Sequence, residues 1–106
     1  MFTRIVECYV KPEKIGEFNE AMQGRVLPIL QGQAGFVDLI ALSSEDEPER
    51  MVAISIWNSK DDAERYHRAH YQEILGSIRP LLQDEPSVEF YNVEASTAAR
   101  ILGKAA

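Results

Sequence analysis

The sequence has a single cysteine, Cys8, among its 106 residues. One thiol can form neither a disulfide nor a thiolate metal cluster within the chain, which is typical of a reducing compartment. Uninterrupted apolar runs are only a few residues long, whereas a membrane-spanning helix needs about 20. Arg4 and Glu7 interrupt the first apolar stretch, so a signal peptide is not expected either. These absences predict a cytoplasmic protein.

Positive charge is also scarce. Eleven Lys and Arg residues stand against seventeen Asp and Glu residues, which gives a formal net charge of −6. Such a chain repels phosphate backbones and anionic membrane surfaces, so neither nucleic acid nor a membrane is an expected partner. The length suits one domain, and 45% hydrophobic residues are enough for a globular core.

Four segments are typical of β-strands because they are rich in β-branched and aromatic residues. They are residues 3–10, 35–43, 50–57 and 87–95. With a helix after the first and after the third strand, the order is β-α-β-β-α-β, which predicts an α+β, ferredoxin-like fold with a four-stranded antiparallel sheet. Residues 1–95 then form the domain, and residues 96–106 a tail or a short arm reaching a partner.

Apolar residues at helical spacing predict the two helices. The first begins at Pro12, and Pro28 should kink or end it near Leu27. The second opens at Lys60, after a capping pair of residues 59 and 62, and ends before Pro80.

The central strands are apolar on both faces. In residues 50–57, one face holds Val52, Ile54 and Ile56, and the other holds Met51, Ala53, Ser55 and Trp57. In residues 35–43, simple alternation puts Phe36, Ile40 and Leu42 on one side, and Val37, Leu39 and Ala41 on the other. Two helices cover one face of a sheet, so the second face would expose an apolar patch that is uncommon on a monomer. We therefore expect a homodimer that pairs through this face.

Three segments resemble the antibiotic biosynthesis monooxygenase (ABM) domain family of the dimeric α+β barrel superfamily. They are the strand end Val-Lys-Pro-Glu-Lys at residues 10–14, the Gly-Phe pair at residues 35–36, and Ile-Trp-Asn-Ser-Lys-Asp-Asp-Ala at residues 56–63, which leads to His67. The resemblance spans residues 3–95. It implies a dimer with sheets packed face to face and a pocket between the sheet and the helices of each subunit. Members of the family include cofactor-free monooxygenases and haem-degrading enzymes, so the fold transfers better than the function.

Trp57 ends the third predicted strand, where it either packs in the core or forms a pocket wall on which a planar substrate stacks. In haem-degrading relatives, a Trp and a helix His ten positions later line the pocket, and Trp57 with His67 reproduces that spacing. Those relatives also use an Asn on the first strand, which residues 4–9 lack. Haem degradation is therefore the least favoured function.

His67 and His70 share a helix face and could form an acid/base couple. Without an added carboxylate, the pair does not predict a metal site. His67 is the candidate proton acceptor, while Tyr66 or Arg79 could hold an anionic phenolate or enolate. His70 and Tyr9 are further candidates for substrate binding, although each of these side chains could instead be structural.

The function these residues predict is a monooxygenase-like enzyme acting on a small aromatic, phenolic or quinol substrate. Because a deprotonated polyphenol can itself donate an electron to oxygen, no cofactor is expected, and the site needs only an apolar cavity, a proton acceptor and a donor for the anion. The alternative is a non-catalytic, stress-associated module that binds a small hydrophobic ligand.

Overall fold

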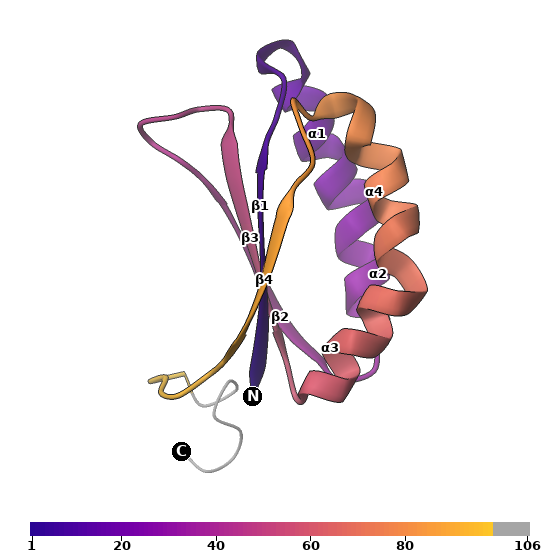
Figure 1. Cartoon of the computed structure of the whole chain (residues 1–106), viewed down its shortest axis with the longest axis vertical. Coiled ribbons are helices and arrows are strands. Elements are labelled where there is room, and N and C mark those ends of the chain that lie inside the picture. The colour runs from indigo at the N-terminus through magenta and orange to yellow at the C-terminus, as the bar shows by residue number, and fades with distance from the viewer. Residues whose placement is uncertain (99–106) are drawn as a thin grey trace.

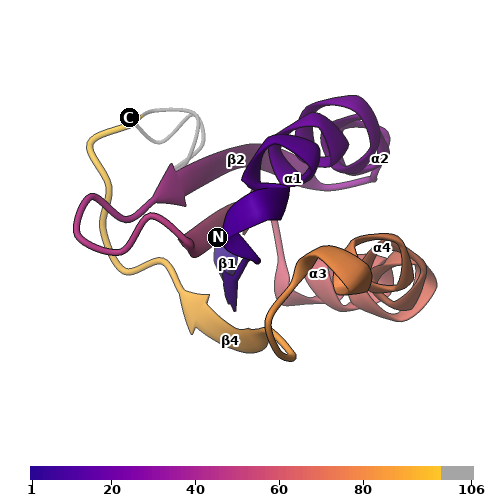
Figure 2. The same ribbon diagram turned by 90° about the horizontal axis from the view of Figure 1, so that it is seen from above.

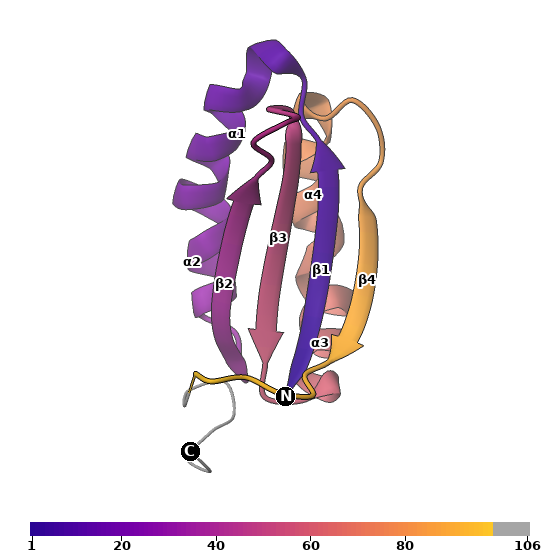
Figure 3. The same ribbon diagram turned by 90° about the vertical axis from the view of Figure 1, so that its left-hand side faces the viewer.

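A four-stranded antiparallel sheet carries two helical segments on one face (Figure 1 and Figure 2). The computed structural model describes residues 1–98, so most of the predicted tail, residues 96–106, lies outside the described residues. The strands are β1 (Phe2–Tyr9), β2 (Phe36–Ser43), β3 (Arg50–Trp57) and β4 (Ser87–Asn92). Their order, β2-β3-β1-β4, is visible on the open face in Figure 3 and confirms the ferredoxin-like fold.

Each helical segment is interrupted by a π turn. The first consists of a 3₁₀ turn (Pro12–Lys14), α1 (Ile15–Ala21), a π turn (Met22–Val26) and α2 (Leu27–Gln31). The second consists of α3 (Lys60–Tyr66), a π turn (His67–Tyr71), α4 (Gln72–Ile78) and a 3₁₀ turn (Arg79–Leu81). Both segments pack on the same side of the sheet (Figure 2).

Pro28 does not end the first helical segment, which was one of the two expected effects. The first segment stays helical through Leu27–Gln31, and its irregularity precedes the proline as the π turn at Met22–Val26. A proline ring clashes with the carbonyl four residues before it, which is that of Gly24. Because the wider π turn displaces this carbonyl, the helix continues past the proline.

The start of the second helical segment follows the predicted capping pair. The Ser59 hydroxyl accepts the backbone N–H of Asp62 at 3.2 Å. The Asp62 side chain in turn lies against Gly35, where a Cβ would collide with it, and Gly35 has a φ of 81°. Glycine is therefore required at the start of β2 both for its backbone conformation and for the space it leaves to the helix cap.

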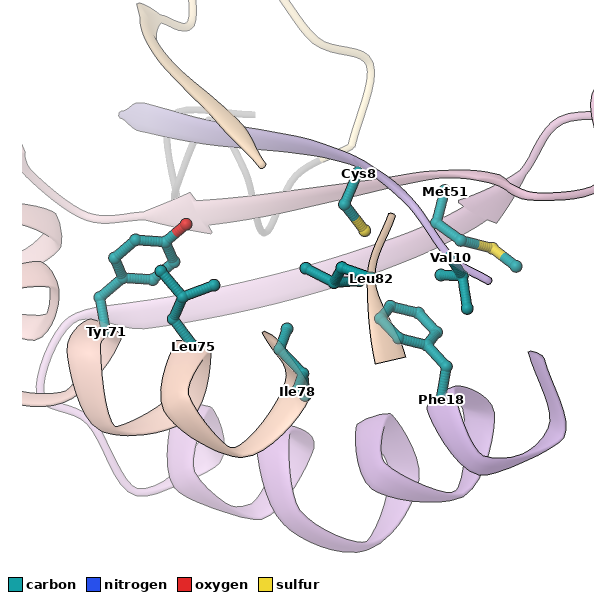
Figure 4. Close-up of a cluster of buried hydrophobic side chains, with 8 residues drawn as sticks. All are labelled: Cys8, Val10, Phe18, Met51, Tyr71, Leu75, Ile78 and Leu82. Atoms are coloured by element: carbon teal, nitrogen blue, oxygen red, sulfur yellow. The ribbon is translucent and has the colours of Figure 1, made fainter. Parts of the chain in front are cut away.

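The core lies between the sheet and the helices in two clusters. The first, shown in Figure 4, consists of Cys8, Val10, Phe18, Met51, Tyr71, Leu75, Ile78 and Leu82. The second consists of Phe2, Val26, Leu30, Trp57, Ala63, Tyr66 and Ile74. Each large apolar side chain buried in this way contributes about 1.5–3 kcal/mol, so both helical segments are held firmly on the sheet.

The opposite face of the sheet, here called the outer face, is open over most of its area in the single chain, although Thr3 and Ile56 at one end are buried. Ile54 lies at its centre, paired with Ile5 on β1 and Ile40 on β2. Ile40 and Leu42 remain 41% and 47% exposed. The outer face is thus apolar across three strands, as the alternation in β3 predicts.

The prediction for β2 was wrong at its first residue. A β-bulge between Phe36 and Asp38 shifts the register, so Phe36 packs beside Trp57 on the helix side, together with Leu39. An extra residue in one strand reverses the face of every side chain before it, which simple alternation cannot anticipate. Within residues 1–98, no helix combines the length and the apolar character needed to cross a bilayer.

Candidate functional site

A cavity of about 450 Å³ lies between the sheet and both helical segments. Its walls are mainly apolar, with Met22, Val26, Leu30, Leu39, Met51 and Ile74 among them. Asn19, Gln23 and Ser43, which also line it, are exposed at the surface. The mouth therefore opens between the first helical segment and the edge strand β2. The volume lies in the range of small-molecule binding sites.

Arg4 is the single charged side chain among the described residues that line this cavity. It is the third residue of β1 and is 4% exposed. Its Nη2 atom is buried and forms no hydrogen bond with any described residue. Burial lowers the pKa of Arg4, and the nearby Tyr66 and Tyr71 partly offset this effect. A buried polar atom without a partner is rare and calls for a functional or structural reason.

Aromatic rings hold the Arg4 guanidinium in place. Its carbon lies 4.3 Å from the ring centre of Tyr71 and 5.3 Å from that of Tyr66. Such contacts stabilise a cation against the ring faces. The Nε–H of Arg4 donates to Nδ1 of His67 at 3.2 Å. The guanidinium is thus anchored at Nε, and a side-chain hydrogen bond with Tyr71 favours its charged form, while Nη2 has no hydrogen-bond partner among the described residues.

His67 contacts Arg4 and lines a second cavity. Its Nδ1 accepts the bond from Arg4, so the proton of the neutral imidazole is on Nε2. Burial and the Arg4 charge lower the pKa of His67, which keeps the ring neutral at neutral pH. It stacks on Tyr71 at 4.7 Å and meets Phe90 edge-on at 5.8 Å. This geometry suits a residue that positions Arg4, because protonating Nδ1 would set two cations against each other.

Trp57 and Tyr66 form the wall next to Arg4. Tyr66 lines the cavity, and burial raises its pKa. Trp57 is completely buried, stacks on Tyr66 at 5.2 Å, and donates from Nε1 to the Ser55 hydroxyl at 2.9 Å. Trp57 thus contacts Tyr66 and Ser55, which both line the cavity. Its own predicted role as a pocket wall stays a prediction.

The other predicted residues lie further from Arg4. His70 is half-buried and stacks on Tyr66 at 6.2 Å. Tyr9 lies on the outer face, where its hydroxyl donates to Glu47 at 3.3 Å. Arg79 is exposed at the end of the second helical segment and pairs with Glu85 at 3.0 Å. Their predicted roles also stay predictions.

Sequence reasoning did not single out Arg4, Tyr71 or Ser55 as cavity residues. Arg4 could have been found from the alternation of the first strand. Positions 2, 4, 6, 8 and 10 share one face of that strand, and Arg4 is the one charged residue among otherwise apolar side chains. Cys8, which also lines the cavity, is not a ready nucleophile, since burial raises the pKa of its thiol to about 11. Within residues 1–98, no group of three His, Cys, Asp or Glu side chains could hold a metal ion.

The depressed pKa of His67 predicts a stability that depends on pH. As pH falls through the ordinary imidazole value of about 6.5, the unfolded chain binds a proton before the folded one does. The free energy of unfolding should therefore be highest above pH ~6.5 and decrease below it. Urea titrations at several pH values should show a smaller decrease in His67→Gln than in the wild type. A decrease in His67→Gln as large as that in the wild type would contradict the prediction.

The fold and the cavity together define a class: ferredoxin-like domains with an apolar cavity between the sheet and the helices. Residues 1–77 match the family model of antibiotic biosynthesis monooxygenases. The chain belongs to this family, and its membership supports a general monooxygenase-like role. No protein of the curated set matches the sequence.

Solved structures agree on the fold. A protein of Nitrosomonas europaea that carries the same family name has 23% sequence identity and a TM-score of 0.77, over 90% of this chain and 100% of its own. A conserved protein of Methanosarcina mazei Go1 has 22% identity and a TM-score of 0.75, over 86% and 91%. SnoaB, a cofactor-independent oxygenase of Streptomyces nogalater, has 18% identity and a TM-score of 0.75, over 91% and 95%. Identities this low show a shared architecture and leave the substrate open.

Proposed function

We propose that this protein is a cofactor-independent monooxygenase that oxidises a small aromatic phenol or quinol in the cavity between sheet and helices. The observation that carries the proposal is an apolar cavity in which, among the described residues, the one charged lining group is a cation. Such a site favours the ionised form of a phenol or enol, which is the form that reduces oxygen most readily.

The proposed reaction needs no redox group from the protein. A ring methylene of an anthrone-like substrate loses a proton to water at the cavity mouth, and the resulting anion transfers an electron to O₂. Recombination of the two radicals forms a peroxide anion, which takes up a proton from water and then loses water, so that CH₂ and O₂ become C=O and H₂O. Tyr66 supports the proposal as a hydroxyl donor lining the cavity, and the apolar walls keep water from competing for the anion.

Oxygen consumption tests this function. The purified protein should accelerate oxygen uptake by a panel of anthrones and quinols, and ¹⁸O₂ should label the new carbonyl. Ala41→Phe, at the exposed β2 side of the cavity, should block entry and reduce the rate. Ala69→Phe, on the exposed surface of the second helical segment, is the matched control and should not. Uptake no faster than without protein, or unaffected by Ala41→Phe, would refute the proposal.

Simple ligand binding is the second candidate, and the observation that favours it is the lack of a carboxylate base among the described cavity residues. Trp57 stacks on Tyr66, a residue of the cavity wall, so a bound aromatic compound should quench its fluorescence. Quenching without oxygen uptake would indicate a binding module.

We also propose that the chain forms a homodimer through its outer face, in the cytoplasm. The exposed side chains of Ile40 and Leu42, in line with Ile54 and Ile5, support this assembly. Two-fold pairing would let one self-complementary apolar surface cover its copy. The cytoplasmic location is supported by the lone, buried thiol of Cys8.

A further inference from the structure

We infer that the cavity binds its aromatic ligand as an oxyanion held by Nη2 of Arg4, and that His67 is the positioning residue for this contact. The inference rests on the proposed function for the aromatic nature of the ligand. It goes further by specifying the ionisation state of the ligand, the atom that recognises it and the residue that orients that atom.

The first argument is the unused hydrogen-bonding capacity of Arg4. The side chain is 4% exposed, yet Nη2 has no hydrogen-bond partner among the described residues. Leaving a buried donor unpaired is costly, and Arg4 is among the residues that line the cavity, so a ligand seated there is the candidate partner. An oxyanion would accept a hydrogen bond from Nη2 and would also neutralise the positive charge of the guanidinium.

The second argument is that the other groups near Arg4 leave its charge uncompensated. The remaining titratable side chains lining the cavity are Cys8, Tyr66 and Tyr71, and burial raises the pKa of each of them. All three are therefore neutral at neutral pH. His67, on the other side of the guanidinium, is also neutral. The cavity thus lacks an anion of its own, and a bound anion would not be repelled by any described lining residue.

The third argument is that the guanidinium is held in a fixed orientation. His67 binds Nε at 3.2 Å, while the ring of Tyr71 lies 4.3 Å from the guanidinium carbon. A planar group fixed at one edge and one face presents its remaining donors in a defined direction. His67 therefore acts through Arg4, without contacting the ligand itself.

A coloured, non-oxidisable ligand tests this inference. A monohydroxyanthraquinone changes its absorbance when it ionises, and its methyl ether cannot ionise. Because an opposite charge within hydrogen-bond reach lowers a phenol pKa by about 1–3 units, the wild type should lower the pKa of the bound dye by that amount. It should also bind the hydroxy dye at least about tenfold more tightly than the methyl ether.

Variants separate recognition from positioning. Arg4→Met should abolish both the pKa shift of the dye and the preference over the methyl ether, and Arg4→Lys should retain part of each. His67→Leu should reduce the shift, whereas His67→Gln should preserve it, since an amide oxygen can accept the Nε–H of Arg4. Melting curves confirm that each variant is folded.

Two results would overturn the inference: no binding of the hydroxy dye by the wild type, or an unchanged shift in Arg4→Met. If His67→Leu and His67→Gln reduced the pKa shift of the bound dye equally, the positioning role of His67 would be overturned. The dye consumes no oxygen, so the outcomes remain distinct. Arg4-dependent binding without oxygenase activity would refute the proposed function alone, and oxygenase activity without an Arg4-dependent shift would refute the inference alone.

Discussion

Replacing Arg4 with methionine should leave the protein at least as stable as the wild type while removing most of its activity. Methionine is close to the aliphatic part of arginine in size and flexibility, so it can fill the same space without opening a new hole. A kcat/KM lower by about 10²–10³ is expected, comparable to the removal of one donor from an oxyanion site.

The stability follows from opposing contributions. Arg4→Met loses the hydrogen bond to His67, worth about 0.5–1.5 kcal/mol, and ring contacts worth about 0.5–2 kcal/mol. It also removes a buried, unpaired donor and the desolvation of a charge, which together cost several kcal/mol. The free energy of unfolding should therefore stay equal or rise by up to about 2 kcal/mol. Urea denaturation measures this change, and oxygen uptake measures the activity.

Arg79→Met is the matched control. Arg79 is exposed and its ion pair with Glu85 lies at the surface, so its loss should change stability by less than about 1 kcal/mol and leave activity intact. Loss of activity in Arg79→Met with normal Arg4→Met activity would instead favour Arg79 as the anion-holding residue. A destabilisation of Arg4→Met by more than about 2 kcal/mol would indicate a structural arginine.

Ile54→Glu should convert the proposed homodimer into monomers. Ile54 lies between Ile5 and Ile40 in the centre of the outer face. Two-fold symmetry would bury two uncompensated carboxylates at the interface, each costing about 3–5 kcal/mol. The dimer dissociation constant should rise at least about 10³-fold, as measured by analytical ultracentrifugation over a range of concentrations.

Two further variants make the dimer result interpretable. Gln72→Glu adds the same charge on the exposed surface of α4 and should remain dimeric. Ile40→Glu, at a side chain already 41% exposed in the single chain, should weaken the dimer with little strain on the fold of the subunit. A wild-type chain that sediments as a monomer at all concentrations would contradict the proposal, as would an Ile54→Glu dimer of unchanged affinity.

The sequence predicts the sheet more completely than the site. Local patterns identify β3 to the residue and the Ser59 cap of the second helical segment, because alternation and capping depend on neighbours in the chain. They fail at the bulge after Phe36 and at the π turns, where one added residue changes the phase of everything beyond it. The site depends on contacts between distant residues. Arg4 and His67 are 63 residues apart, and no spacing rule connects them.

The π turn at His67–Tyr71 places two aromatic side chains on the same side of the helix, which a regular α-helix would not do at this spacing. Tyr66 and Tyr71 both lie against Arg4 although they are five residues apart. In an α-helix of 3.6 residues per turn, five residues would turn the two side chains about 140° away from each other. Hydrogen bonding between residues five apart returns them to one side. One extra residue in the helix thus brings two tyrosine rings into contact with the same guanidinium. Deleting that residue would separate the two rings, so the length of this helix matters to the position of Arg4 as much as its composition does.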